Sequence, residues 1–204
     1  MSVIAKASET RQRLLDAARS LMLQRGFNAT GIDQICTEAK VTKGAFFYYF
    51  PSKEALGQAA LAEWAACGTS IYAQAKAEPM LAPLDHLHRF FEIMEGLVLH
   101  TPGQLTCLVG MFSQEMSAAN PVLREACSQY LSDWAEWAEL LLREAKAALP
   151  PTTDFDPAEV AWFLNCIWQG GMLIAKTRQQ PALLVQSLRH ARAYVDGLFY
   201  GPLP

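Results

Sequence analysis

The residues best suited to chemistry lie in a short aromatic segment, VTKGAFFYYFPSKEAL, at residues 41–56. On a helix that starts near Lys43, Tyr48 and Tyr49 point to the side that also carries the lysine. Phenol hydroxyls and ammonium groups donate hydrogen bonds to phosphate oxygens, and an aromatic ring makes a stiff contact with thymine methyls or sugars. The segment therefore predicts a helix surface that faces DNA. The alternative is an ordinary packed helix with two solvated tyrosines.

The surrounding elements are all predicted to be helices, because apolar residues recur at helical spacing and no segment alternates with period two. A first helix follows a cap at Ser8 or Thr10 and stops at Gly26. Thr30 and Asp33 form a capping pair for a second, short helix. The fold class is therefore all-α.

The aromatic segment is predicted to be the third helix, from its cap at Thr42 through Tyr49, and Pro51 ends it. Phe46 and Phe50 are four residues apart, so both face the first two helices and anchor the third. Three short helices with a tight turn between the last two predict a helix-turn-helix.

The charge is unevenly distributed along the chain. The formal net charge is -3, but residues 1–56 hold 8 Lys or Arg against 5 Asp or Glu, whereas residues 57–204 hold 9 against 15. A basic N-terminal segment on an acidic body indicates that one end meets an anion.

Other function classes find little support in the sequence. Five cysteines without a CxxC pair, and four histidines without a cluster, predict neither a disulfide scaffold nor a metal site, and no cofactor motif is present. No catalytic motif indicates an enzyme. No apolar stretch is long enough to cross a bilayer and no signal-peptide h-region is visible, so we expect a cytoplasmic protein with no membrane partner.

The stretch FNATGIDQICTEAKVTKGAFFYYFPSKEAL, residues 27–56, resembles the TetR family of bacterial transcriptional regulators. The resemblance implies a DNA-binding domain at residues 1–52 and a domain for ligand binding and dimerisation at residues 53–204. It further implies a homodimer on double-stranded operator DNA, acting as a repressor that a small-molecule inducer releases. Activation and a second dimer on the operator are alternatives.

By position, the resemblance assigns phosphate contacts to one set of residues and base contacts to another. The phosphate set is Thr30, Thr42, Lys43, Tyr49 and Lys53, and the base set is Gly44, Ala45 and Tyr48. Two residues depart from the family pattern. Lys40 replaces a usual turn glycine, which predicts either an added phosphate contact or some backbone strain. Phe47 replaces a usual tyrosine, which removes a hydroxyl contact.

The C-terminal helices are predicted to form the dimer interface. The segment AWFLNCIWQGGMLIAK is too apolar for a peripheral helix, and its two glycines allow a second backbone to come close. The alternative is a core helix of a monomer. The predicted interface residues are Trp162, Phe163, Ile167, Gly170, Gly171, Ile174, Leu188 and Tyr194.

Aromatic and methionine residues of the body predict an apolar ligand pocket with a few polar groups. The predicted lining is Trp64, Tyr72, His86, Phe90, Cys107, Met111, Gln114, Trp134, Trp137 and Trp168. A carrier of hydrophobic ligands without a DNA role would explain this body but not the N-terminal helices.

A thiol sensor is a further alternative. The segments LTCLVGMFSQE and IWQGGMLIAK resemble stretches of the N-ethylmaleimide repressor branch of the family, in which a cysteine and a lysine act together. Cys107 and Lys176 are the matching residues, and a nearby ammonium would lower the pKa of the thiol. Buried cysteine that only fills a core is the competing interpretation.

Overall fold

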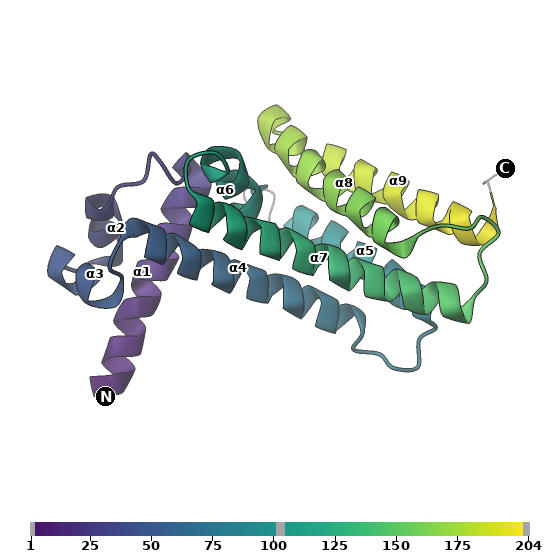
Figure 1. Cartoon of the computed structure of the whole chain (residues 1–204), viewed down its shortest axis with the longest axis horizontal. Helices are drawn as coiled ribbons and strands as arrows, with labels where there is room; N and C mark the ends of the chain where they lie inside the picture. The colour runs from purple at the N-terminus through teal and green to yellow at the C-terminus, as the bar shows by residue number, and fades with distance from the viewer. Residues whose placement is uncertain (1–2, 101–104, 202–204) are drawn as a thin grey trace. The chain divides into compact units, whose positions relative to one another are not determined.

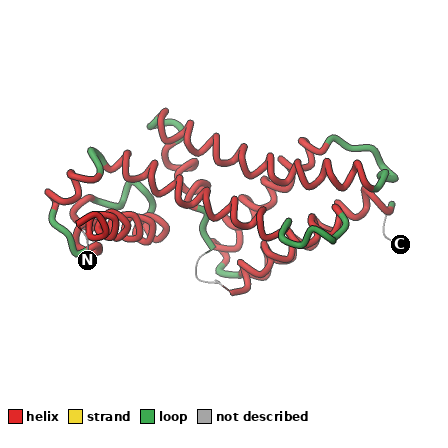
Figure 2. The backbone as a smooth tube through the Cα atoms, turned by 90° about the horizontal axis from the view of Figure 1, so that it is seen from below, coloured by secondary structure: helices red, strands yellow, loops and turns green. Residues whose placement is uncertain are grey.

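Helices account for most of the described chain. The computed structural model describes residues 3–100 and 105–201, with side chains from residue 7 onward. Within these ranges the backbone forms nine helices and no strand (Figure 2). The helices are α1 (Val3–Arg25), α2 (Ile32–Ala39), α3 (Lys43–Tyr49), α4 (Lys53–Ala75), α5 (Pro83–His100), α6 (Leu108–Met116), α7 (Pro121–Ala148), α8 (Pro157–Arg178) and α9 (Pro181–Tyr200) (Figure 1). The all-α prediction is confirmed.

Two predicted helix starts are wrong. α1 begins at Val3 rather than after Ser8 or Thr10, because the residues before these two can all adopt helical backbone and none of them is a proline or glycine. α2 is capped by Gly31, whose N–H donates to Oε1 of Gln34 at 3.0 Å. Thr30 instead donates its hydroxyl to the Gly26 carbonyl at 2.7 Å, because that carbonyl ends α1 without a helical partner.

Other caps agree with the sequence. Thr42 Oγ1 accepts from the Ala45 N–H at 3.1 Å at the start of α3. Asn120 precedes Pro121 and accepts from a backbone N–H of the first turn of α7, and Asp156 does the same before Pro157 of α8. Proline at the first helical position loses nothing, because its missing N–H would have no helical partner.

The chain divides into two compact units. The first comprises Met1–Ala66 and Cys107–Gln129, and the second comprises Cys67–Thr106 and Tyr130–Pro204. The first unit holds α1 to α3, the first part of α4, α6 and the start of α7. α1 packs against α2 and α6. The larger buried side chains of this first unit include Leu14, Leu15, Met22, Phe27, Ile35, Phe46, Leu56, Leu61 and Phe112.

The second unit is a helical bundle in which α9 packs on both α5 and α8. α8 and α9 run side by side (Figure 1). Gly171 of α8 makes this close packing possible, since a Cβ there would lie 2.6 Å from Cδ1 of Leu184. The core of the unit includes Leu87, Phe90, Phe91, Met94, Ala138, Leu141, Leu142, Ala161, Leu164, Leu184 and Val195. No helix in the described part of the chain is long and apolar enough to cross a membrane.

Candidate nucleic-acid interface and ligand-binding body

α3 is anchored by one buried ring and leaves its other rings exposed or partly exposed. Phe46 is fully buried, and its ring centroid lies 6.2 Å from that of Phe50, which is also buried. Tyr48 is 80% exposed and packs edge-on against Tyr49, with 4.9 Å between ring centroids. Phe47 is about half exposed. The helix is therefore fixed to the unit by one face while its tyrosines remain accessible.

The first turn of α3 carries the exposed cation of this surface. Thr42, Lys43 and Gly44 are all exposed. Lys43 Nζ lies 2.9 Å from Oδ1 of Asp33, and both side chains are largely solvated. An exposed pair of this kind contributes little to stability, so the ammonium can exchange the carboxylate for a phosphate at low cost.

The turn between α2 and α3 is held by Arg13 of α1. Lys40 ends α2 in the left-handed region, at φ 55° and ψ 47°. The Arg13 guanidinium donates to the Ala39 carbonyl through Nε at 3.0 Å and Nη2 at 2.7 Å, and to the Lys40 carbonyl at 2.9 Å. This guanidinium satisfies carbonyls that the end of α2 leaves without partners. The backbone strain predicted for Lys40 is thus present, and its side chain is exposed.

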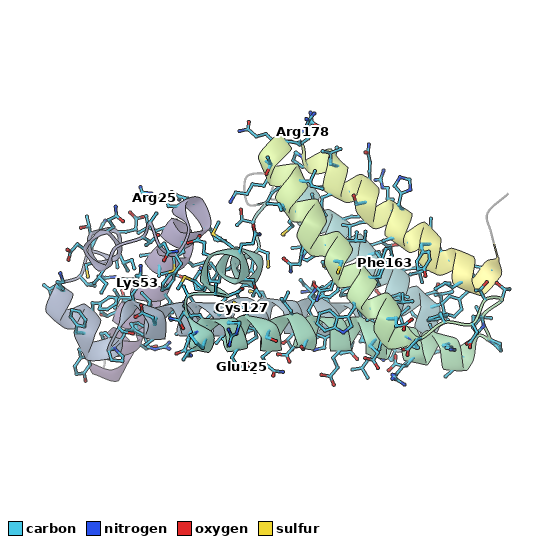
Figure 3. All side chains as sticks on the ribbon, turned by 45° about the horizontal axis from the view of Figure 1, so that its top comes forward. Arg25, Lys53, Glu125, Cys127, Phe163 and Arg178 are labelled. Carbon is cyan, nitrogen blue, oxygen red and sulfur yellow. The ribbon has the colours of Figure 1, made fainter. Side chains whose placement is uncertain are left out.

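Thr30 and Lys53 act within the fold. Thr30 is fully buried, and its hydroxyl is bound to Gly26. Lys53 Nζ donates to the carbonyls of Phe27 at 3.0 Å and Thr30 at 3.1 Å, and it lies 4.3 Å from the centre of the Phe27 ring (Figure 3). In this conformation both residues stabilise the turn between α1 and α2. Thr30 therefore has no hydroxyl free for a phosphate, contrary to the prediction.

The same turn is also bound by α6. Oε2 of Glu115 accepts from the Asn28 N–H at 2.9 Å, and the carboxylate lies directly against Gly26, which has φ +88°. The Phe112 ring packs edge-on against Phe27 at 5.1 Å. One element beyond the helix-turn-helix thus holds the turn through a carboxylate and an aromatic ring.

α8 and α9 together present an exposed apolar face. Trp162, Phe163, Ile174 and Tyr194 are exposed, and the rings of Phe163 and Tyr194 lie 5.1 Å apart. Phe163 is labelled in Figure 3. Ile167 is half-buried, and a Cβ on Gly170 would meet no atom within 4 Å.

Two residues of the predicted interface lie elsewhere. Leu188 is buried in the core of its own unit, and Gly171 faces Leu184 within the chain. Both positions serve packing between α8 and α9.

The predicted pocket residues fall in both units. Trp64, Cys107, Met111 and Gln114 belong to the first unit, where Gln114 is exposed on α6. Tyr72, His86, Phe90, Trp134, Trp137 and Trp168 belong to the second.

In the second unit several of these rings pack on one another. The Tyr72 ring stacks on that of Trp137 at 6.5 Å, and Phe90 lies 5.7 Å from Trp134. His86 is buried, with Nε2 2.9 Å from the Glu78 carbonyl. Its Nδ1 has no hydrogen-bond partner among the described residues.

Asn165 is a second buried polar residue of this unit. Its Nδ2 donates to the Leu131 carbonyl of α7 at 2.9 Å. Within the described ranges no group donates to its Oδ1. The second unit thus combines an aromatic interior with polar atoms for which the described residues offer no partner.

Comparison with known proteins decides the family. The family model described as "Bacterial regulatory proteins, tetR family" matches residues 14–60, and the one described as "Tetracyclin repressor-like, C-terminal domain" matches residues 83–191, more than half of the chain. The chain belongs to the TetR family. Regulators of this family bind operator DNA and small-molecule ligands and form dimers, and the family consists of transcriptional regulators rather than enzymes.

Individual relatives agree with this assignment. "Transcriptional regulator AcuR" of Cereibacter sphaeroides is 31% identical over 86% of this chain and 80% of the relative. "HTH-type transcriptional repressor DhaR" of Mycobacterium sp. strain GP1 is 27% identical over 87% of this chain and 88% of the relative. The crystal structure of a regulatory protein TetR from Rhodobacter sphaeroides is 31% identical, has a TM-score of 0.79 and covers 89% of this chain and 96% of that one. This TetR-family protein is a DNA-binding, helix-turn-helix transcriptional regulator of the ligand-responsive type.

The thiol-sensor alternative is not favoured by these comparisons. NemR of Escherichia coli is 47% identical, but only over 26% of this chain, and its reduced form is 26% identical over 96% of this chain with a TM-score of 0.75. The structure places Cys107 at the N-cap of α6, where Sγ accepts from the Gly110 N–H at 3.5 Å, and Lys176 in the other unit. Burial raises the pKa of the Cys127 thiol, and burial also raises that of Cys36. In the described part of this TetR-family chain no cluster of three His, Cys, Asp or Glu could hold a metal ion.

Three residues that shape these sites were missed from the sequence. Arg13 and Glu115 carry no local signal, because each acts on a turn that is distant along the chain. Asn165 does have a signal: it is an amide within the otherwise apolar run VAWFLNCIW of a TetR-family C-terminal domain.

Proposed function

We propose that this regulator binds a near-palindromic operator as a homodimer, through α3, and leaves the DNA when a small molecule binds the body. Residues 1–52 are assigned to DNA binding and residues 53–204 to ligand binding and dimerisation, in the cytoplasm. The observation that carries the proposal is the division of α3 into a buried anchor, Phe46, and an exposed face with Lys43 and Tyr48. A tyrosine at 80% exposure contributes little to the core of the unit, so its ring is available to a partner.

The proposed contacts follow from this exposure. Thr42, Lys43, Tyr49 and the Lys40 ammonium donate to phosphates, which sets the position of the helix on the duplex. Gly44, Ala45 and Tyr48 face the base edges, where small residues allow the backbone to approach. Lys53 contributes through the α1–α2 turn, where two of its donors are already bound to carbonyls. Thr30 is not part of the proposed contact surface.

Dimerisation is proposed through the exposed face of α8 and α9. Phe163, Ile167, Gly170 and Ile174 follow one another at spacings of three or four residues, so they form a stripe along α8. The open space at Gly170 would admit a side chain of the second copy. An isologous contact of this kind pairs the stripe with itself.

Signal transfer is proposed to use α6. The helix begins just after the chain passes from the second unit to the first, between Thr106 and Cys107. Its Phe112 and Glu115 hold the α1–α2 turn. A ligand that shifts α6 would therefore change the support of the DNA-binding helices.

Salt-dependent binding to a duplex from the upstream region of its own gene tests the proposal. We expect Lys43→Ala to weaken binding and to reduce the slope of log K against log salt by about 1.8, because the homodimer loses one phosphate contact in each half-site. Lys76→Ala is the matched control, since this lysine pairs with Glu144 in the second unit. Fluorescence anisotropy from low to physiological salt provides the slopes.

Two results would contradict the proposal. Equal slopes for the wild type, Lys43→Ala and the control would remove α3 from the interface. A footprint without dyad symmetry would argue against a dimer with half-sites about 34 Å apart. Retention of ligand binding without any DNA binding would instead support the hydrophobic-ligand carrier.

A further inference from the structure

Asn165 of α8 holds its side-chain amide in one orientation. The residue is 2% exposed, and its Nδ2 donates to the Leu131 carbonyl of α7 at 2.9 Å. Only the amide nitrogen can donate to a carbonyl, so this bond assigns the nitrogen and places Oδ1 on the other side. Oδ1 has no donor within the described ranges of the chain.

The bond to Leu131 does not explain why an amide is present. Leu131 lies inside α7, where its carbonyl already accepts from the N–H four residues later. A leucine at position 165 would fill a similar volume without burying an unpaired acceptor. Buried polar groups in native proteins almost always have partners, so an exception of this kind calls for a water molecule, an ion or a ligand as the partner.

Two tryptophans follow Asn165 and Leu131 along their helices. Trp168 follows Asn165 by one turn on α8 and is buried. Trp134 follows Leu131 by one turn on α7 and packs on Phe90 at 5.7 Å. An apolar, aromatic interior with very few polar atoms is typical of small-molecule sites, in which the polar atoms set orientation and selectivity.

We propose that Oδ1 of Asn165 accepts a hydrogen bond from the inducer, which is a small, largely aromatic or apolar molecule with a hydroxyl or N–H donor. The inference rests on the proposed function, because it assigns a selectivity residue to the body that binds the inducer. A ligand with an ether oxygen or methylated nitrogen at the same place leaves the acceptor unpaired, and binding then falls.

Matched pairs of probes test this inference on the full-length protein. The pairs are phenol with anisole, benzyl alcohol with benzyl methyl ether, and indole with 1-methylindole, and in each pair a methyl group replaces the hydrogen of the donor. We expect the donor member of a pair to bind the wild type about fivefold to tenfold more tightly, as measured by calorimetry. In Asn165→Leu the difference should fall within about twofold, while the unfolding temperature of the free protein should not decrease.

The wild-type comparison does not depend on how well the variant folds. Equal affinities within every pair, or no binding by any donor member, would overturn the inference, as would a preference that Asn165→Leu retains. Anisotropy with the upstream duplex separates this inference from the proposed function. Donor probes that bind through Asn165 without releasing DNA would refute the inducer mechanism and leave the acceptor assignment intact. Normal DNA binding together with equal affinities for the two members of every probe pair would refute the acceptor assignment and leave the proposed function intact.

Discussion

Replacing Gly26 by alanine should destabilise the first unit through two separate effects. The residue has φ +88°, where a Cβ costs about 1 kcal/mol. That Cβ would also lie 2.0 Å from Oε1 of Glu115, so the carboxylate must leave and its 2.9 Å bond with the Asn28 N–H is lost. Because Asn28 is exposed, we assign that bond about 1 kcal/mol. The expected loss of unfolding free energy is therefore about 2 kcal/mol.

A double-mutant cycle separates the two effects. Glu115→Ala alone should cost about 1 kcal/mol, and in that background Gly26→Ala should cost only the backbone strain of about 1 kcal/mol. The double variant should thus lose about 2 kcal/mol rather than about 3, which gives a coupling energy of about 1 kcal/mol. Urea unfolding at one fixed protein concentration measures these values, since dimerisation makes stability concentration-dependent.

Gly44→Ala supplies a control with the opposite sign. Gly44 is exposed in α3, and a Cβ at this position would come no closer to a neighbouring group than 3.9 Å, from the Thr42 hydroxyl. Alanine should therefore raise stability by up to about 1 kcal/mol. Additive costs for Gly26→Ala and Glu115→Ala would refute the contact between α6 and the turn. A Gly26→Ala variant as stable as the wild type would refute both effects.

Three further predictions concern the surface of the two units. Lys40→Gly should raise the unfolding free energy, measured by urea unfolding, by about 0.5 kcal/mol, because glycine adopts the left-handed backbone of this position without steric strain. Unchanged or lower stability would contradict this. Asp33→Asn should tighten DNA binding severalfold at low salt, because it frees Lys43 and removes a negative charge, and an anisotropy titration at two salt concentrations should show the gain shrinking as salt rises. Cys166 should react with a maleimide more slowly than Cys67 in the dimer, although both thiols are exposed in a single chain, and equal rates by mass spectrometry would place the interface elsewhere.

The fold was largely predictable because its signals are local. The spacing of Phe46 and Phe50 identified the buried side of α3, and caps at Thr42, Asn120 and Asp156 set helix starts. Each of these signals depends on residues within about one helical turn. The start of α1 could not be predicted from a cap, because the residues before Ser8 and Thr10 also adopt helical backbone and the helix extends through both positions.

The roles of cations in the DNA-binding unit were less predictable. Lys43 and Lys53 look alike in sequence, yet Lys43 pairs with a solvated carboxylate and Lys53 binds two backbone carbonyls. The difference arises because α4 brings Lys53 beside the α1–α2 turn, which is more than twenty residues away along the chain. Partners created by tertiary packing cannot be inferred from charge and spacing alone.

Gly170 and Gly171 also show that the partner of a residue in the folded protein cannot be inferred from its neighbours along one helix. Both residues have the same small size and the same apolar neighbours along the chain, so the sequence predicts that both meet a partner chain. Successive residues of an α-helix point about 100° apart. One glycine therefore faces Leu184 in its own chain, while the other faces open space. Periodicity establishes that the two faces differ, but which face meets α9 depends on how α9 packs. The close approach of α8 and α9 thus uses Gly171, and this leaves Gly170 as the glycine at which the proposed second copy would come near the α8 backbone.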